Sequence, residues 1–548
     1  MPDTTRTSEG AARPAAHPGP DAATPDHGST KWWTLVAVCL GTFMLLLDVT
    51  IVNVALPSIQ TDLHANFADL QWVVDAYALT LAALLLTAGS VADRFGRKRL
   101  YVIGLAVFTG ASLLCGVAGD PLLLQLARGL QGIGGAVMFA VSLALLADAF
   151  RGKDRGTAFG IWGAVTGLAV AIGPLLGGAL VSGLSWRWIF FVNLPLGLFA
   201  IGLTVRAVAE SRSPQARRPD WAGFILFTGA LAALVYGLIE SNQAGFGSGK
   251  VWGSLLAAAL LLAGFFAVEA RGAHPMFDLA LFRLPTFTGG AVAAFGISAT
   301  IFAMLLYLTL YLQDVLGYTP LQTGLRLLVL SGGILLTSTV AGRLSSKVPV
   351  RWLIGPGLLL VGAGLLLMRG LDAGSTWIHL VPGLVVAGIG VGMINPPLAS
   401  TAIGVVQPQQ AGMASGINST FRQVGIATGI ALLGTLFANQ VSSYVTDHAA
   451  QVPGLAGHGD ELSTAIQSGA ASRVIGTAPP QARAAIVELT TNAFTTGLNQ
   501  ILLVAAVVAL VSGVVSLLSI RSKDFTQPTT DLISKPANKV TGAQLRQP

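Results

Sequence analysis

Apolar runs of about 20 residues recur along most of the chain, and short polar segments separate them. A run of this length is what an α-helix needs to cross a hydrocarbon core about 30 Å thick. The pattern therefore predicts an all-α polytopic membrane protein with fourteen transmembrane helices. The expected helices cover residues 33–57, 71–91, 100–118, 122–147, 157–181, 187–207, 220–240, 251–270, 287–312, 321–344, 352–369, 377–403, 413–439 and 495–519.

Three segments depart from this pattern. Residues 1–30 and 521–548 are polar and lack an apolar stretch, so we expect two disordered cytoplasmic tails. Residues 440–494 are polar and interrupted by Pro and Gly, and the helix count places them outside as a long external loop. As an alternative, residues 481–492 of that loop form a short interfacial helix.

Composition excludes a soluble protein. Of the 548 residues, 53% are hydrophobic and 10% are charged, and the mean hydropathy is +0.70. A soluble domain has about 25% charged residues, so this chain has too little polar surface. The net charge of +7 does not indicate nucleic acid, because the basic residues lie in short loops. Cys39 and Cys115 lie inside apolar runs, and we predict no disulfide scaffold, metal site or cofactor.

Basic residues in the short loops are distributed unequally between the two sides. Sixteen fall on one side, whereas only Arg187, Lys250 and Arg369 fall in the alternate loops. Because Lys and Arg concentrate in cytoplasmic loops, this asymmetry predicts that both termini are cytoplasmic. The sixteen are Arg94, Arg97, Lys98, Arg99, Arg151, Lys153, Arg155, Arg206, Arg212, Arg217, Arg218, Arg271, Arg283, Arg343, Lys347 and Arg351.

The loop between the second and third helices carries an ordered motif. Gly89 permits close helix packing, Asp93 and Arg94 end the helix, and Gly96 lets a very short loop turn before Arg97. An ordinary basic loop explains the charges but not this order. The motif resembles the signature of the major facilitator superfamily. With Asp148 at the end of the fourth helix, Asp93 and Arg97 are expected to form a charge network that locks the outward-open state and breaks in the other.

Two further helices carry unusual residues. Arg128 lies within the fourth helix, where a guanidinium persists if it faces a cavity and finds a partner; the alternative is an Arg that snorkels to the interface. The fifth helix places small residues on one face beside a proline, which generic packing explains only in part. The spacing resembles the motif of facilitator-superfamily antiporters, with Ala169 where glycine is usual. Its residues here are Gly160, Gly173, Pro174, Gly177 and Gly178.

Helices 1, 2 and 6 narrow the resemblance. The segments around Asp48 and Asn53, around Asp75 and Tyr77, and from Trp186 to Pro195 are similar to EmrB/QacA-type drug:proton antiporters with fourteen helices. The later helices 10 and 13 hold Arg326 and Arg422 but no Asp or Glu.

The resemblance implies two six-helix bundles, at residues 31–207 and 286–520, around a central cavity. Residues 208–285 then supply two linking transmembrane helices and their flanking cytoplasmic loops.

The resemblance also implies proton-coupled export of hydrophobic, cationic or amphiphilic drugs or antibiotics across the plasma membrane, by a protein that is functional as a monomer. A proton-coupled carrier of a nutrient or metabolite, and a non-transporting membrane sensor or enzyme, are the alternatives. The sequence lacks a Walker lysine motif, which argues against an ATP-driven pump.

Counting along the helices places Asp48, Asp75 and Arg128 at one depth in the outer half of the membrane. We expect Asp48 to couple export to protons, Asp75 to attract cationic drugs, and Arg128 to modulate both. Alternatively, Asp48 hydrogen-bonds within its own bundle and Asp75 sits at the water interface.

Overall fold

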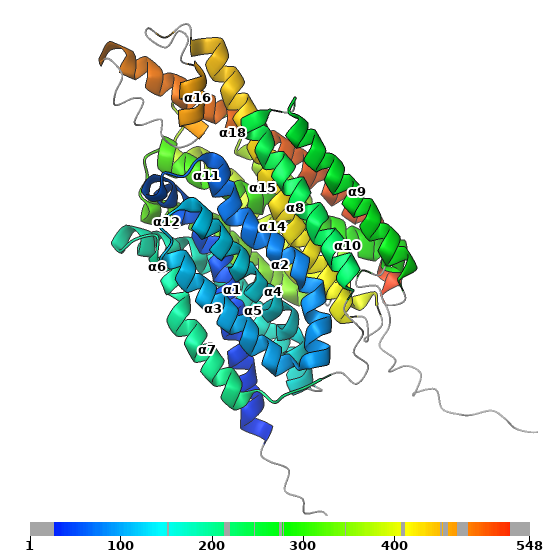
Figure 1. Ribbon diagram of the computed structural model, residues 1–548. Helices are drawn as coiled ribbons and strands as arrows, with labels where there is room; N and C mark the ends of the chain where they lie inside the picture. Colours follow the sequence, from blue (N-terminus) through cyan, green and yellow to red (C-terminus); the bar gives the residue numbers. More distant parts are fainter. Residues whose placement is uncertain are drawn as a thin grey trace, which may run out of the picture.

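A computed structural model describes residues 27–150, 153–212, 220–245, 247–272, 277, 279–345, 347–406, 411–449, 452, 459–467 and 480–525. Every regular element in these ranges is a helix, and most run along one common direction (Figure 1). The predicted tails lie mainly outside the described residues, as do Arg151, Arg217 and Arg218.

The first group of helices, here called the N-half, contains α1 to α7. These helices pack mainly on one another, with α4 against α2 and α3, and α1 against α5 and α7. Their bounds are α1 (His27–Leu63), α2 (Phe67–Phe95), α3 (Arg97–Gly116), α4 (Pro121–Ala149), α5 (Lys153–Gly183), α6 (Trp188–Phe191) and α7 (Asn193–Ala207).

The last group, here called the C-half, repeats this arrangement with more interruptions. Its first spanning segment contains two π-helical stretches, η2 and η3, on either side of α11. Its elements are η1 (Leu279–Arg283), α10 (Pro285–Ile297), η2 (Ser298–Phe302), α11 (Ala303–Leu310), η3 (Tyr311–Val315), α12 (Pro320–Leu344), α13 (Arg351–Leu367), η4 (Trp377–Leu380), α14 (Val381–Gly404), α15 (Ala411–Ala449), α16 (Gly459–Gln467), α18 (Pro480–Ser519) and η6 (Ser522–Asp524).

Two helices, α8 (Trp221–Ala244) and α9 (Gly249–Arg271), connect the halves. Helix α8 packs on α2 of the N-half and on α15 of the C-half, and α9 packs on α8. The outer helix α9 exposes Trp252, Leu256 and Leu260. Such an apolar outer face suits contact with lipid, as the linking pair requires.

In the described residues, twelve helices are long and apolar enough to cross a membrane, and a thirteenth is counted if bent α5 is one span. Helix α13 is apolar but has only 17 residues. The predicted count of fourteen therefore stays a prediction, while the all-helical membrane fold is confirmed.

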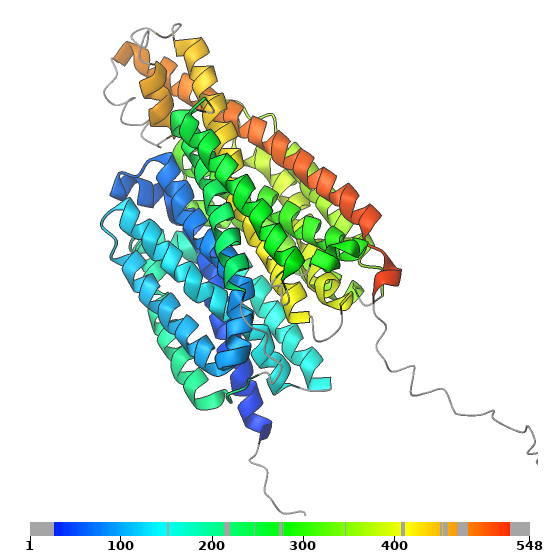
Figure 2. The ribbon, with the colours of Figure 1, turned by 45° about the vertical axis from the view of Figure 1, so that its right-hand side comes forward.

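The two ends of the bundle are distinct (Figures 1 and 2). Helix α1 begins and α18 ends at one end, here called the terminal face, and α16 lies at the other, the distal face. Local chemistry sets the turns at both faces. At the terminal face, Gly96 adopts φ +117° between α2 and α3, a conformation that favours glycine. At the distal face, Asn66 and Asp69 form a capping box that begins α2.

The segment predicted as an external loop, residues 440–494, is largely helical where it is described. Helix α15 continues to Ala449, α16 lies beyond it, and residues 481–492 belong to the unbroken helix α18. Leu462, Ile466 and Ile486 are buried in one apolar cluster. The sequence prediction of a loop was wrong here because polar composition masked apolar residues that recur on one face of each helix.

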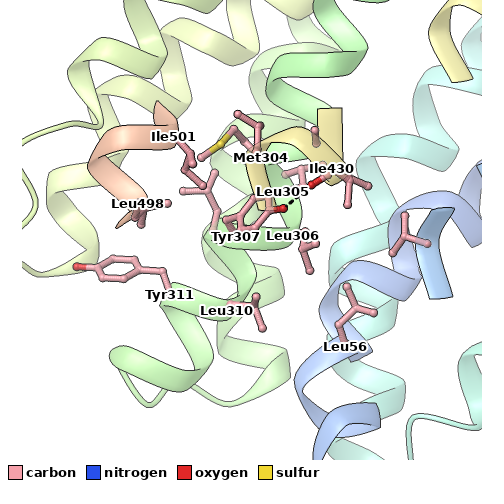
Figure 3. Packing of buried hydrophobic residues seen from close by; sticks show 14 of the residues in the cluster. Leu56, Met304, Leu305, Leu306, Tyr307, Leu310, Tyr311, Ile430, Leu498 and Ile501 are labelled. Carbon is pink, nitrogen blue, oxygen red and sulfur yellow. Dashed lines mark hydrogen bonds between the residues drawn. The ribbon is translucent and has the colours of Figure 1, made fainter. Parts of the chain in front are cut away.

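The core of the C-half centres on α11, whose residues are all buried. Figure 3 shows Met304, Leu306 and Leu310 among side chains from α1, α15 and α18. The Tyr307 hydroxyl donates to the carbonyl oxygen of Ile430 at 2.7 Å, which fixes α11 against α15. This packing provides a rigid wall on one side of the interface between the halves.

Candidate functional site

Asp48 and Arg128 form an ion pair inside the N-half. Their side chains are 0% and 1% exposed, and Nη1 of Arg128 contacts Oδ2 of Asp48. Gln131 Nε2 donates to Asp48 Oδ1 at 2.8 Å, and Asn193 Nδ2 lies 3.4 Å from the same oxygen. Both carboxylate oxygens of Asp48 therefore accept hydrogen bonds. Asp48 thus hydrogen-bonds within its own bundle, as the alternative interpretation of the sequence expected. Arg128, for which the sequence predicted a partner, pairs with Asp48.

The guanidinium of Arg128 makes three hydrogen bonds, including the one to Asp48. Its Nη1 also donates to Gln131 Oε1 at 2.7 Å, and its Nε donates to the carbonyl oxygen of Val73 at 3.0 Å. Its Cζ lies 4.3 Å from the centre of the Tyr77 ring. A buried charge pair is tolerated when its remaining donors and acceptors find partners. In this pair Nε and Nη1 of Arg128 and both carboxylate oxygens of Asp48 have partners. Arg128 does not snorkel to an interface.

Helix packing brings these residues together. At Gly132 an added Cβ would lie 2.5 Å from the carbonyl oxygen of Tyr77, so α4 approaches α2 closely only because this residue has no side chain. Gln131 and Asn193, to which the sequence analysis gave no role, complete the network. Their polar side chains inside apolar runs were the available signal.

Asp75 does not join this network. The Tyr77 ring and the backbone carbonyl of Val73 contact Arg128. Residues two positions apart on a helix point to different sides, so Asp75 lies on another side of α2 than Tyr77. That side packs on α15 of the C-half, because Gln71, one turn earlier, donates to the carbonyl oxygen of Ile430 at 3.1 Å. Asp48, Arg128 and the neighbours of Asp75 lie at a similar depth, as the sequence predicted. Asp48 and Asp75 nevertheless belong to two separate sites.

Asp75 is a buried carboxyl group to which no described residue donates a hydrogen bond. The residue is 0% exposed, and both carboxylate oxygens are buried without a donor in the described part of the chain. This excludes a place at the water interface in the conformation described. Burying a charge without partners costs several kcal/mol, whereas a neutral group is cheaper to bury. Asp75 therefore lies in the interface between the halves. Its surroundings there do not stabilise a negative charge on the carboxyl group.

The antiporter-motif residues of α5 divide between two neighbours. A Cβ at Gly173 would contact Thr50, and one at Gly177 would lie 2.8 Å from Ile51 Cγ1, so both pack on α1. A Cβ at Gly178 would instead lie 2.5 Å from the carbonyl oxygen of Pro320, on α12 of the C-half. Gly173 and Gly177 therefore pack within the N-half, whereas Gly178 packs on the C-half. The surroundings of Gly160 lie outside what the structure describes.

The two halves meet near the distal face. Gly324 of α12 packs on the backbone of Pro174, the amide of Leu321 donates to Ser182 Oγ at 3.0 Å, and Gln313 Nε2 donates to the carbonyl oxygen of Val54 at 2.9 Å. Helix α5 bends by 41° next to Pro174, whose ring removes a backbone hydrogen bond. Toward the terminal face, an added Cβ at Gly89, Gly163 or Gly167 would meet no atom within 4 Å. The expected close packing at Gly89 is therefore absent here, and the structure is closed at the distal face.

An apolar pocket lies between the halves below this contact. Thr50 and Pro174 come from the N-half, and the other residues come from η2, α11, α12 and α14. The C-half residues of the lining are Ile301, Phe302, Leu305, Leu327, Leu330, Ser331, Ile334 and Val391. Apart from the hydroxyl-bearing Thr50 and Ser331 the lining is apolar, and the pocket is small in this conformation.

We expect Gly178→Ala to reduce transport at least about tenfold, because backbone atoms of Pro320 cannot move aside for the new Cβ as a flexible side chain would. Transport rates in vesicles with matched protein amounts would measure this. Gly167→Ala on the same helix is the control, since its Cβ meets open space. Equal rates in Gly178→Ala and the wild type would show that transport does not require this contact.

The predicted charge network at the terminal face is formed. Nε of Arg97 donates to Oδ1 of Asp93 at 2.8 Å, and Nη1 contacts Asp148, which also accepts from Ser211 Oγ at 2.6 Å. Arg94 is exposed and lies over the Phe95 ring instead. All partners belong to the N-half or the segment after it, and the network is present with the distal face closed. Moving one half against the other would separate none of these residues, so the expectation that the network breaks in one of the two states stays a prediction.

Sequence reasoning missed Glu210 at this network. Its two carboxylate oxygens accept from the backbone amides of Lys98 and Arg99, each at 3.1 Å, at the start of α3. A carboxylate is favoured there by the free amides of a helix N-terminus. A Cβ at Gly96 would lie 2.8 Å from this carboxylate, so Gly96 serves both the turn and the approach of Glu210.

Comparison with known proteins places this geometry in context. The sequence profile of the Major Facilitator Superfamily matches residues 38–430. The chain is 40% identical to the multidrug resistance protein Stp of Mycobacterium tuberculosis, over 76% of this chain and 78% of that protein. It is 34% identical to the tetracenomycin C resistance and export protein of Streptomyces glaucescens, over 90% of this chain and 93% of that protein. It is 37% identical to the puromycin resistance protein pur8 of Streptomyces alboniger, over 83% of this chain and 90% of that protein.

Solved structures share the fold at low sequence identity. A bacterial homolog of the human lysosomal transporter Spinster, in an inward-facing and unoccupied conformation, superposes with a TM-score of 0.60 at 18% identity. That match covers 91% of this chain and 99% of the other. The helical arrangement described above is therefore one that known transporters adopt.

Proposed function

The chain belongs to the Major Facilitator Superfamily, and from this premise we propose that it exports hydrophobic or amphiphilic drugs or antibiotics across the plasma membrane in exchange for protons. It is a multi-pass transporter and not an enzyme. Three relatives are named for resistance to drugs or antibiotics, and export by this chain would likewise confer resistance.

The observation that carries the proposal is the interface between the halves. It encloses an apolar pocket, and at the α2–α15 contact it buries Asp75 without a partner. When the halves rock, a group in their interface gains access to water on one side and then on the other. A carboxyl there is able to bind a proton on one side and release it on the other while the pocket delivers its ligand.

The expected orientation assigns a state to the described conformation. The basic loops favour a cytoplasmic terminal face, so the distal face would be external. The described conformation then has its external side closed. Both halves and the pocket come from one chain, so transport requires no second copy, and the surrounding partner is the lipid bilayer.

Purified protein in proteoliposomes tests the proposal. With an imposed pH gradient, addition of drug should collapse the gradient, and drug should accumulate against its own gradient. Uptake of a nutrient or metabolite with protons, without drug movement, would support the carrier alternative instead. Absence of flux for every compound tested would contradict transport coupled to protons.

A further inference from the structure

Arg422 is a charged residue within the membrane-spanning part of α15. It lies six residues, or about 9 Å, beyond Gly416, where the candidate span begins. Its Nη2 donates to Asn395 Oδ1 on α14 at 3.3 Å, and its Cζ lies 6.0 Å from the centre of the Phe302 ring. An arginine at such a position persists where it faces a cavity or a polar partner.

No carboxylate balances this charge among the described residues. None of their ion pairs includes Arg422. Helices α12 and α14 contain no Asp or Glu, and the only acidic residue of α15 is Asp447, at its far end. Arg128 in the N-half, by contrast, has its carboxylate partner and three further contacts. A guanidinium has five N–H donors, and one weak contact to an amide leaves most of them available.

Arg422 borders the apolar pocket between the halves. Phe302, beneath the guanidinium, lines the pocket, and so does Val391, one turn before Asn395. Helix α15 reaches this position because Gly425 and Gly429 pack on the backbone of the segment that contains η2, where added Cβ atoms would lie 2.6 Å from carbonyl oxygens. The pocket thus combines an apolar wall with an unneutralised cation at its edge.

We propose that this pocket recognises hydrophobic anions, and that Arg422 pairs with the negatively charged group of the substrate. The proposal rests on the export function above and specifies its substrate class. A carboxylate, sulfonate or ionised phenol supplies acceptors for the free N–H groups. When the halves part, the aromatic or aliphatic body of the substrate packs on the apolar residues that line the pocket. The resemblance implied cationic or amphiphilic substrates, and Asp75 was the residue expected to attract cations. Asp75 lies on the face of α2 against α15 and does not line the pocket.

A matched pair of fluorescent probes tests the charge preference. Anilinonaphthalene sulfonate and phenylnaphthylamine share their aromatic rings and differ by the sulfonate. We expect wild-type proteoliposomes to transport both. Arg422→Gln should lower transport of the sulfonate at least about tenfold and change transport of phenylnaphthylamine less than about twofold, since a charge-assisted pair is lost only with the anion. Arg422→Lys, which keeps the charge, should retain most sulfonate transport.

Asn395→Ala is the control for a purely structural role, because it removes the link between α15 and α14 but keeps the guanidinium. It should spare sulfonate transport. Equal losses of both probes in Arg422→Gln, at normal protein amount and melting temperature, would overturn the proposal. Wild-type protein that moves phenylnaphthylamine but not the sulfonate would also overturn the proposal. That result would still support the export of hydrophobic drugs. Wild-type protein that moves neither probe but exchanges protons for other drugs would overturn this proposal alone, whereas absence of flux for every compound would contradict export as well.

Discussion

Asp75→Asn is expected to leave a folded protein that still equilibrates drug across the bilayer but no longer concentrates it with a pH gradient. The carboxyl group is fully buried at the contact of α2 with α15, and no donor stabilises its charge. An asparagine has nearly the same shape but cannot exchange a proton. Drug accumulation driven by an imposed pH gradient should therefore fall at least about a hundredfold, whereas drug exchange without a gradient should persist.

The same assay separates two roles for this residue. Asp120→Asn is the matched control, because Asp120 caps α4 through the amide of Leu123 and asparagine caps equally well. It should behave as the wild type. If Asp75→Asn loses cationic drugs but still concentrates neutral ones, Asp75 attracts cations, as the sequence alone suggested, and does not carry the proton.

The position of Asp75 in the structure shows what counting residues along helices can predict and what it cannot. Depth follows from helix length, so Asp48, Asp75 and Arg128 were placed at one level. Rotation about the helix axis decides the partners. The spacing Val73, Asp75, Tyr77 already implied that Asp75 faces away from whatever Val73 and Tyr77 face. The identity of the facing helix, α15, required the tertiary structure.

The sequence spacing of glycines predicts close contacts but not the partner helix. The spacing of Gly173, Gly177 and Gly178 predicted close helix contacts, but two of them face α1 and one faces α12. Adjacent glycines point about 100° apart, so only the packed structure decides which one meets the other half. Arg422 illustrates the reverse case. Its sequence context showed the lack of an acidic partner, while its place beside the pocket emerged only from the fold.

The second large effect concerns the ion pair of Asp48 and Arg128. Asp48→Asn and Arg128→Gln should each destabilise the protein by about 3–5 kcal/mol, because each leaves the other charge buried and unpaired. The double variant should be more stable than either single variant, since neutral amides replace both charges. Unfolding midpoints in detergent, compared in a double-mutant cycle, measure this coupling. Additive losses would show that the two side chains do not stabilise each other.

The double variant also decides between the two candidate proton sites. Its Asp48 site has no group that titrates, while Asp75 is unchanged. If the double variant still concentrates drug with a pH gradient, the Asp48–Arg128 pair is a structural brace of the N-half, and the proton exchanges at the interface with the C-half. If the gradient has no effect although the protein is stable, Asp48 is the coupling residue that the sequence predicted. The hydrogen bonds to both oxygens of Asp48, against none at Asp75, favour the first result.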